Sequence, residues 1–373
     1  MSNIPTVTPS QLPRFLQYCF SKNRNPFVWG PPGTAKSAVI RQTAAAVADA
    51  NGWVFFDCGK DDRAKAQDPK NTFGFIDTRV STADASDIKG FGYLDVENNK
   101  TTWLVPDCLP DPEVHGHQGI LFLDEFAQGV PLVTGGYSQL ILDHHVGSYK
   151  LPEGWHIVAA SNDKHHGCNT NRIGAHLHNR FGHVEVIPDA DDWAANELRS
   201  GVGDARVCGF VRARPELLFQ LEKDDKAFPT MRSWTSVSEA VKEIDDDADF
   251  LRTVVGSYVG TGPANELLGY LALIAQGGEI PTWDQIRHRP DTAPVPTQSR
   301  QTLSLSFAII GIIANNVEDV DDIPAIVTYI KRLEKDYAAT LMHDLWSKDE
   351  TLFDCVAATQ WRSDNPTVVF SPK

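Results

Sequence analysis

Short apolar runs alternate with longer polar or alanine-rich stretches over the first half of the chain. Turn residues such as glycine, proline and asparagine flank these runs, which lie at 26–29, 53–56, 75–80, 120–123, 157–160 and 184–187. Runs of this kind predict strands that are buried on both faces, and helical patterns such as 136–142 lie between them. The alternation therefore predicts an α/β fold with a parallel sheet covered by helices.

The pattern changes after Pro188, where strand-like runs become scarce and helical periodicity dominates. Helices are predicted at 193–198, 215–221, 233–244, 250–258, 266–274, 304–314 and 323–345. The segment 281–297, rich in proline, threonine and arginine, is predicted to be a connection. We therefore expect two domains, an αβα domain over residues 1–188 and an α-helical domain over residues 189–373.

Length and composition describe a packed globular protein. The chain has 373 residues, and at roughly 150 residues per domain it allows two or three domains with a sizeable core. Its hydrophobic content of 42%, with 9 Trp and 18 Phe, argues against global disorder. The net charge of −15 repels phosphate backbones and anionic lipid, so nucleic acid is not an expected partner.

The cysteines and the amino terminus indicate the cellular compartment in which the protein is expected. The 6 cysteines are widely separated and none forms a C-x-x-C pair, as is typical of reduced thiols in a cytosol. The amino terminus lacks the basic region and apolar core of a signal peptide. The longest apolar run, 303–314, is well below the ~20 residues that span a bilayer. We therefore expect a cytoplasmic protein with no membrane segment.

The strongest chemical signal follows the apolar run 26–29. It consists of Gly30, Pro31, Pro32, Gly33, Thr34, Ala35, Lys36 and Ser37, and an alanine-rich helical pattern comes next. A loop between a buried strand and a helix points backbone N–H groups at phosphates, Lys36 reaches the β- and γ-phosphates, and the Ser37 hydroxyl ligates Mg²⁺. Ala35 replaces the second glycine of the usual pattern, and its Cβ predicts a negative φ there. The segment predicts a nucleotide-binding loop.

Two further apolar runs end in polar side chains. The run 120–123 delivers Asp124 and Glu125 at its carboxyl end, where ligands bind in such sheets. Asp124 is predicted to hold the Mg²⁺ shell through water, and Glu125 to polarise the attacking water. Asn162 follows the run 157–160 and is predicted to orient that water, although asparagine also ends many strands in turns.

Two arginines are candidates for contact with a γ-phosphate. Arg180 lies just before the run 184–187, where it would act as a finger on the nucleotide of a neighbouring subunit or pair with a surface carboxylate. Arg232 lies near a predicted helix start, a position at which the helix dipole disfavours a cation. That position favours a phosphate as its target.

These motifs resemble, in their order along the chain, those of the MoxR family of AAA+ ATPases: Gly-Pro-Pro-Gly-Thr-Ala-Lys-Ser, Leu-Phe-Leu-Asp-Glu, Ala-Ser-Asn, Asn-Arg-Phe and Pro-Thr-Met-Arg-Ser-Trp. The resemblance covers residues 26–234, and alanine before the loop lysine is usual in that family. It implies Walker A roles for Lys36 and Ser37, Walker B roles for Asp124 and Glu125, sensor 1 for Asn162, an arginine finger for Arg180 and sensor 2 for Arg232.

The resemblance also implies an AAA+ P-loop αβα core followed by a helical lid, with ATP and Mg²⁺ as cofactors. It implies hydrolysis in a homo-oligomeric ring, commonly a hexamer, often with a von Willebrand factor A-domain partner, to remodel or activate a client protein. Hairpins predicted at 87–104 and 145–150 correspond to the helix-2 insert and the pre-sensor-1 hairpin of this clade. Each of them faces a pore or a partner, or is inert.

Three other functions stay open at this point. A McrB-like nucleic-acid motor is disfavoured by the net charge of −15. A small-molecule P-loop kinase would need neither a finger nor sensors, and a nucleotide-gated scaffold would bind ATP but barely hydrolyse it. The sequence identifies neither client, partner nor ring size.

Histidine and cysteine residues gather in the segment 165–183. Their spacing matches no closed four-ligand zinc template, so we favour ordinary polar loop residues there. Metal binding in this segment stays an open question.

Overall fold

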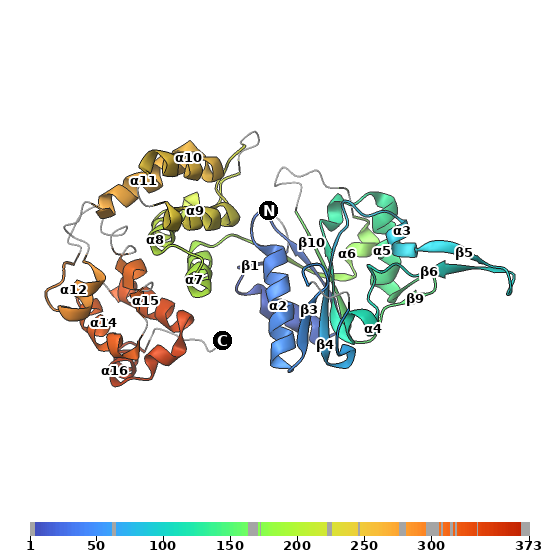
Figure 1. The fold of residues 1–373 in the computed structure, drawn as a ribbon, viewed down its shortest axis with the longest axis horizontal. Helices are drawn as coiled ribbons and strands as arrows, with labels where there is room; N and C mark the ends of the chain where they lie inside the picture. The colour runs from blue at the N-terminus through green and yellow to red at the C-terminus, as the bar shows by residue number, and fades with distance from the viewer. Residues whose placement is uncertain are drawn as a thin grey trace. The chain divides into compact units, whose positions relative to one another are not determined.

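A computed structural model gives the fold of the chain (Figure 1). It describes residues 4–61, 65–162, 171, 173–221, 226–244, 247–275, 281–295, 306, 309–313, 316–317, 319–333 and 335–366. The chain divides into two compact units, Met1–Ile187 and Pro188–Lys373.

A seven-stranded sheet in the order β1–β11–β2–β10–β7–β4–β3 forms the centre of the first unit. The strands are β1 (Thr6–Val7), β2 (Asn25–Trp29), β3 (Val54–Asp57), β4 (Thr72–Arg79), β7 (Gln118–Asp124), β10 (Trp155–Ser161) and β11 (Phe181–Val186). All neighbouring strands in it are parallel, so the predicted parallel sheet is confirmed and every strand ends at the same edge.

Helices cover both faces of this sheet because each strand alternates its side chains between two cores. In β7, Phe122 packs in the core with α1 (Leu12–Ser21) and α2 (Lys36–Ala50). Its neighbour Leu123 packs in the core with α5 (Pro131–Asp143), which contains the predicted helix 136–142. The remaining short helices of the described first unit are α3 (Ser86–Lys89), α4 (Pro112–His115) and α6 (Ala175–His178).

Two antiparallel hairpins extend the first unit. β5 (Phe91–Asp95) pairs with β6 (Lys100–Leu104), and β8 (His145–Val146) pairs with β9 (Tyr149–Lys150). Both hairpins expected from the sequence are therefore confirmed as hairpins. Figure 1 shows β5 and β6 projecting away from the sheet of this unit.

The second unit is helical in its described residues, which confirms the predicted fold class, a P-loop αβα core with a parallel sheet followed by an α-helical region. The α-helices whose bounds the structure gives there are α7 (Ala190–Ser200), α8 (Ala205–Ala213), α9 (Met231–Glu243), α10 (Ala248–Val259), α11 (Thr261–Ala275), α12 (Trp283–His288), α14 (Ile323–Ile330), α15 (Lys335–Lys348) and α16 (Val356–Asp364). The described residues 309–313, within the predicted helix 304–314, are helical as well. No helix in the described ranges is long and apolar enough to cross a membrane.

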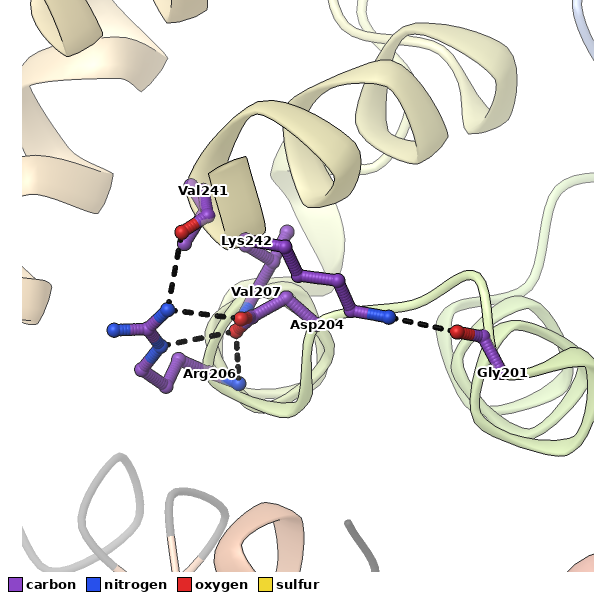
Figure 2. A network of polar contacts seen from close by, with 6 residues as sticks. All are labelled: Gly201, Asp204, Arg206, Val207, Val241 and Lys242. Atoms are coloured by element: carbon purple, nitrogen blue, oxygen red, sulfur yellow. Dashed lines mark hydrogen bonds and ion pairs between the residues drawn. The ribbon is translucent and has the colours of Figure 1, made fainter. Parts of the chain in front are cut away.

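Polar contacts fix the helix ends of the second unit (Figure 2). Asp204 caps α8 by accepting from the backbone N–H of Arg206 at 2.8 Å, and it also pairs with the Arg206 guanidinium at 2.9 Å. The same guanidinium donates to the carbonyl oxygen of Val241 at 3.1 Å, and Lys242 donates to the carbonyl oxygen of Gly201 at 2.7 Å. These contacts join the ends of α7, α8 and α9.

Several helices were not predicted from the sequence, among them α1, α8 and α16. In α1, Leu12, Leu16 and Cys19 are buried at helical spacing, so the signal was present. In α8 nearly every residue is buried, and no polar face marks the helical period. A fully buried helix of this length cannot be told from other apolar segments by periodicity.

Three further segments differ from the predicted helices and connections. The predicted helix 215–221 is only a 3₁₀ turn at Pro215–Leu217. The predicted connection 281–297 contains α12, which starts with a capping box between Thr282 and Gln285. The predicted helix 323–345 is two helices, α14 and α15, because α14 ends at Ile330 and α15 begins at Lys335.

Candidate nucleotide-binding site

The predicted phosphate loop, residues 30–37, leaves the carboxyl end of β2 and leads directly into α2. Gly30 has a φ of 154°, and a Cβ there would lie 2.7 Å from the carbonyl oxygen of Val186, so only glycine fits. The buried Thr34 hydroxyl donates to the carbonyl oxygen of Pro31 at 2.8 Å. This hydrogen bond closes the loop on itself.

Ala35 adopts the left-handed conformation, with a φ of 59°. The negative φ expected from its Cβ is therefore wrong. The left-handed conformation costs roughly 1–2 kcal/mol for an alanine, so the surrounding loop must hold it. Ala35 is the N-cap of α2 and has no side-chain oxygen to cap the first turn. A helix that starts without a side-chain cap suits an anion at its amino end.

Lys36 is 8% exposed, and its ammonium group donates hydrogen bonds both within the loop and to Asn162. It donates to the carbonyl oxygens of Gly30 at 2.9 Å and Pro31 at 2.8 Å, and to Asn162 Oδ1 at 2.9 Å. A buried cation requires such partners, because burial without them is costly. The loop therefore holds its one positive side chain directly beside the strand end that carries Asn162.

Ser37 and Asp124 meet across the sheet edge, as the sequence predicted for a magnesium site. The Ser37 hydroxyl donates to Asp124 Oδ2 at 2.7 Å, while Asp124 Oδ1 accepts from the backbone N–H of Glu125 at 2.8 Å. Hydroxyl and carboxylate oxygens are hard ligands of the kind that Mg²⁺ takes in proteins. The donor set at this edge therefore fits Mg²⁺.

Glu125 also has a left-handed backbone, with a φ of 54°. Its carboxylate accepts a hydrogen bond from the Ser81 hydroxyl, just beyond the end of β4. Sequence reasoning missed Ser81, which is separated from Glu125 by 44 residues. The available signal was a hydroxyl just beyond a strand that ends at the same edge.

A second missed contact lies beside the Ser37–Asp124 pair. Arg41, one helical turn after Ser37, donates to Asp77 Oδ2 at 2.8 Å and pairs with Asp57 at 3.2 Å. Burial, and next the nearby charge of Asp124, raise the pKa of the Asp77 carboxyl. The two ion pairs tie α2 to the ends of β3 and β4, so they fix the start of α2 against Asp124.

Arg180 lies at the other edge of the sheet. Phe181, the first residue of β11, pairs with Asn25, the first residue of β2, whereas the phosphate loop follows the last residue of β2. At about 3.3 Å per residue, the strand length separates Arg180 from the loop of its own chain by well over 10 Å. Arg180 is exposed. The structure therefore does not bring it to this site within one chain.

Arg232 belongs to the second unit, where it is exposed at the second position of α9. A capping box between Thr230 and Ser233 starts this helix. The role of Arg232 towards a nucleotide stays a prediction.

The histidine segment is only partly described, since His165, His166, Cys168 and the neighbouring Arg172 lie outside the described residues. Within the described chain, no group of three or more His, Cys, Asp or Glu side chains is placed to hold a metal ion. His183 instead accepts from the Trp29 indole N–H at 3.0 Å, and burial lowers its pKa. This is a packing contact beneath the phosphate loop.

Comparison with known proteins gives only distant similarities. No family model and no curated protein matches the chain. NtrX from Brucella abortus is similar at 14% identity over 98% of this chain and 69% of its own, with a TM-score of 0.38. Its complex with ATP gives 15% identity, 99% and 70% coverage and a TM-score of 0.37. A RuvB mutant from Thermotoga maritima gives 14% identity, 73% and 77% coverage and a TM-score of 0.33. The fold assignment rests on the strand order, not on these matches.

Proposed function

We propose that the protein is an ATP hydrolase of the AAA+ class, of the MoxR type that its motifs resemble. One observation carries the proposal: Lys36, Ser37, Asp124 and Asn162 come from three different strand ends and meet in hydrogen bonds of 2.7–2.9 Å. A turn that happened to precede Lys-Ser would not gather these partners. The motif order along the chain supports the same class.

The loop would bind the phosphates of ATP, with the backbone N–H groups at the start of α2 directed at them. Lys36 would exchange its carbonyl and amide acceptors for β- and γ-phosphate oxygens. Ser37 and Asp124 would hold Mg²⁺, directly and through water respectively. When bound, Mg²⁺ offsets negative charge on the phosphates.

Glu125 would polarise the water that attacks the γ-phosphate. The hydrogen bond from Ser81 would either orient the Glu125 carboxylate for this role or be given up when the water binds. Asn162, already bonded to Lys36, would orient that water near the γ-phosphate. Charge that develops on the transferred phosphoryl group would be stabilised by Lys36 and by Arg180 of a neighbouring copy. Arg232 would sense the nucleotide from the helical unit.

A finger that acts across copies requires an oligomer, and we propose a homo-oligomeric ring, commonly a hexamer in the family that the motifs resemble. The motion driven by hydrolysis would remodel or activate a client protein, with a von Willebrand factor A-domain protein as the expected partner. Nucleic acid is not proposed as a partner, because the net charge is −15.

The proposal is tested by nucleotide binding and steady-state ATP hydrolysis of the full chain. Lys36→Ala should lose binding of a fluorescent ATP analogue, because the loop loses its only positioned charge. Lys22→Ala, an exposed lysine after α1, is the matched control and should behave as the wild type. Binding by Lys36→Ala at wild-type affinity would contradict the site assignment.

Turnover separates the remaining functions. Wild-type protein that binds ATP without hydrolysing it, at any protein concentration, would indicate a nucleotide-gated scaffold. Turnover that is independent of protein concentration would favour a self-sufficient kinase. Stimulation by DNA at physiological salt would favour a nucleic-acid motor.

A further inference from the structure

The β5–β6 hairpin carries more exposed large hydrophobic side chains than any other element that the structure describes. Among the described residues, 7 of the 15 exposed large hydrophobic side chains lie on it or directly after it, although it is only a small part of the chain. They are Phe91, Tyr93, Leu94, Val96, Trp103, Leu104 and Val105, between 46% and 77% exposed. Apolar patches of this kind mark interaction surfaces on soluble proteins.

The register of the hairpin places apolar side chains on both of its faces. Phe91 pairs with Leu104, and Tyr93 shares their face because side chains two residues apart point the same way. We call these three the Phe–Tyr face. Leu94 and Trp103 lie on the opposite side, which we call the Trp face. A hairpin that lay on a single core would have one apolar and one polar face.

The root of the hairpin is held in place by close contacts, whereas its two strands pair only with each other. Gly90 has a φ of 76°, and a Cβ there would collide with the carbonyl oxygen of Leu104. On the other side of the root, the Cys108 thiol donates to the carbonyl oxygen of Asp87 at 3.0 Å. The hairpin is therefore presented in a defined direction, yet an uncovered two-stranded ribbon is only marginally stable in water.

The tip argues against insertion into lipid. The tip carries Glu97 in the turn and Asp95 and Lys100 at the strand ends, and Asn98 donates to the Asp95 carboxylate at 2.8 Å. Charged side chains at the leading end are costly to place in hydrocarbon. Apart from Val96 at the tip and Val105 after β6, the exposed apolar side chains lie along the two strands, on both faces of the hairpin.

We propose that the hairpins of neighbouring copies pack on one another, with the Phe–Tyr face of one copy against the Trp face of the next. Two faces with different side chains make a heterologous contact that repeats from copy to copy, and such a contact forms a ring when the rotation between copies closes. Each hairpin in a closed ring has one neighbour on each side, which covers both faces at once. A single partner peptide would cover only one. The inference rests on the proposed ring and adds the surface that builds it.

Cysteine cross-linking of the full chain distinguishes this arrangement from others. Tyr93→Cys places a thiol on the Phe–Tyr face and Leu94→Cys places one on the Trp face. In the presence of ATP and a mild oxidant, the double variant should give a ladder of covalent oligomers that ends at the ring size. Either single variant alone should give none above the wild-type background from native cysteines. Val130→Cys, exposed elsewhere in the same unit, is the control.

A second measurement tests the same contact without cysteines, in case the cysteine substitutions disturb the fold of the hairpin. Trp103→Thr keeps a residue that prefers strands but removes the large apolar surface. It should raise the protein concentration at which the oligomer dissociates by ~10-fold or more, measured by sedimentation velocity. Glu97→Gln at the tip should leave that concentration unchanged.

The outcomes separate failure of this inference from failure of the proposed function. An oligomer without cross-links in the double variant would overturn the hairpin contact. Efficient cross-linking of a single variant would show like faces together and would overturn the heterologous arrangement. A protein that stays monomeric with ATP would overturn both the contact and the ring. The cross-links do not require hydrolysis, so loss of turnover alone leaves the test valid.

Discussion

The two edges of the central sheet differ in how they satisfy their polar side chains. At the carboxyl edge, Lys36 is bonded to Asn162, and Ser37 is bonded to Asp124, all within one chain. At the amino edge, Arg24 precedes β2 and Arg180 precedes β11, and both are exposed. Within the described part of the chain, the Arg180 guanidinium makes no hydrogen bond or ion pair.

The difference shows which parts of the proposed chemistry one chain can supply. The carboxyl edge brings together the groups that we propose bind phosphates and Mg²⁺. The amino edge offers a cation that cannot reach the proposed nucleotide site of its own chain, because the whole length of a strand separates them. If the two edges belong to one active site, they do so across copies.

The largest expected effect comes from Arg180→Ala, which removes the cation of the amino edge. Trans-acting arginine fingers contribute ~10³–10⁵ in rate in other P-loop systems, so turnover should fall by a factor in that range while ATP binding stays normal. Arg24→Ala, at the same edge and equally exposed, is the matched control and should keep wild-type turnover. Steady-state ATP hydrolysis and equilibrium binding are the measurements.

A mixture of two inactive variants tests directly whether the two sheet edges act together across copies. Arg180→Ala combined with Glu125→Gln should regain part of the activity, because some interfaces then contain an intact Glu125 from one copy and an intact Arg180 from its neighbour. Mixed oligomers that hydrolyse no faster than their separate components would show that Arg180 is not a finger. Arg172 would then be the next residue to test.

A smaller loss is expected at the carboxyl edge from Glu125→Gln. The amide cannot polarise water, so turnover should slow by ~10²-fold or more while ATP affinity is kept. The variant should accumulate as an ATP-bound oligomer. Glu153→Gln, an exposed glutamate near the start of β10, is the control. Wild-type turnover by Glu125→Gln would move the catalytic role elsewhere, with Asp124 the next candidate.

Sequence alone predicted those site residues that directly follow a recognisable buried strand. Asp124 and Asn162 could be placed beside the phosphate loop because buried parallel strands all end at the same edge. Ser81 and the Arg41–Asp77 pair could not, because their partners are set by the strand order, which local patterns do not reveal. The position of Ser81 depends on β4 lying next to β7 in the sheet.

The helical unit was less predictable for a related reason. α8 is buried on nearly all sides, so its sequence has no polar face from which to read a period. The role proposed for Arg232 would depend on a contact with the nucleotide rather than on its own helix, so the pattern of that helix cannot reveal it. Local sequence therefore predicts a strand end well and a contact between distant segments poorly.

Low pH should lower the stability of the folded first unit by a moderate amount, because of His156 near the start of β10. Its ring stacks on Phe20 with centroids 4.6 Å apart, and burial, then the charge of His144, lower its pKa to about 4. The folded state therefore binds fewer protons than the unfolded state, whose histidine pKa is about 6.5. Stability falls as the pH drops below that value, by about 2 kcal/mol between pH 7 and pH 5.

His156→Phe should remove this loss while keeping the ring stack. Amide hydrogen-exchange protection in β10, compared at pH 7 and pH 5, is the measurement. His288→Gln changes an exposed histidine of the other unit and should leave the acid sensitivity of β10 as it is in the wild type. Equal loss of protection in His156→Phe and wild type would assign the sensitivity to other groups, such as His183.

The smallest effect is expected from Ala35→Gly in the phosphate loop. Glycine removes the roughly 1–2 kcal/mol cost of the left-handed conformation but makes the unfolded chain more flexible, which costs about 0.5–1 kcal/mol. The net expectation is a gain of about 0.5–1 kcal/mol in stability with unchanged ATP affinity, because the backbone path at a φ of 59° is kept. Ala46→Gly, exposed within α2, should instead destabilise by about 1 kcal/mol. Thermal unfolding followed by circular dichroism should therefore show a higher melting temperature for Ala35→Gly and a lower one for Ala46→Gly. A lower melting temperature in both variants would mean that the Ala35 methyl group makes contacts that outweigh its backbone strain.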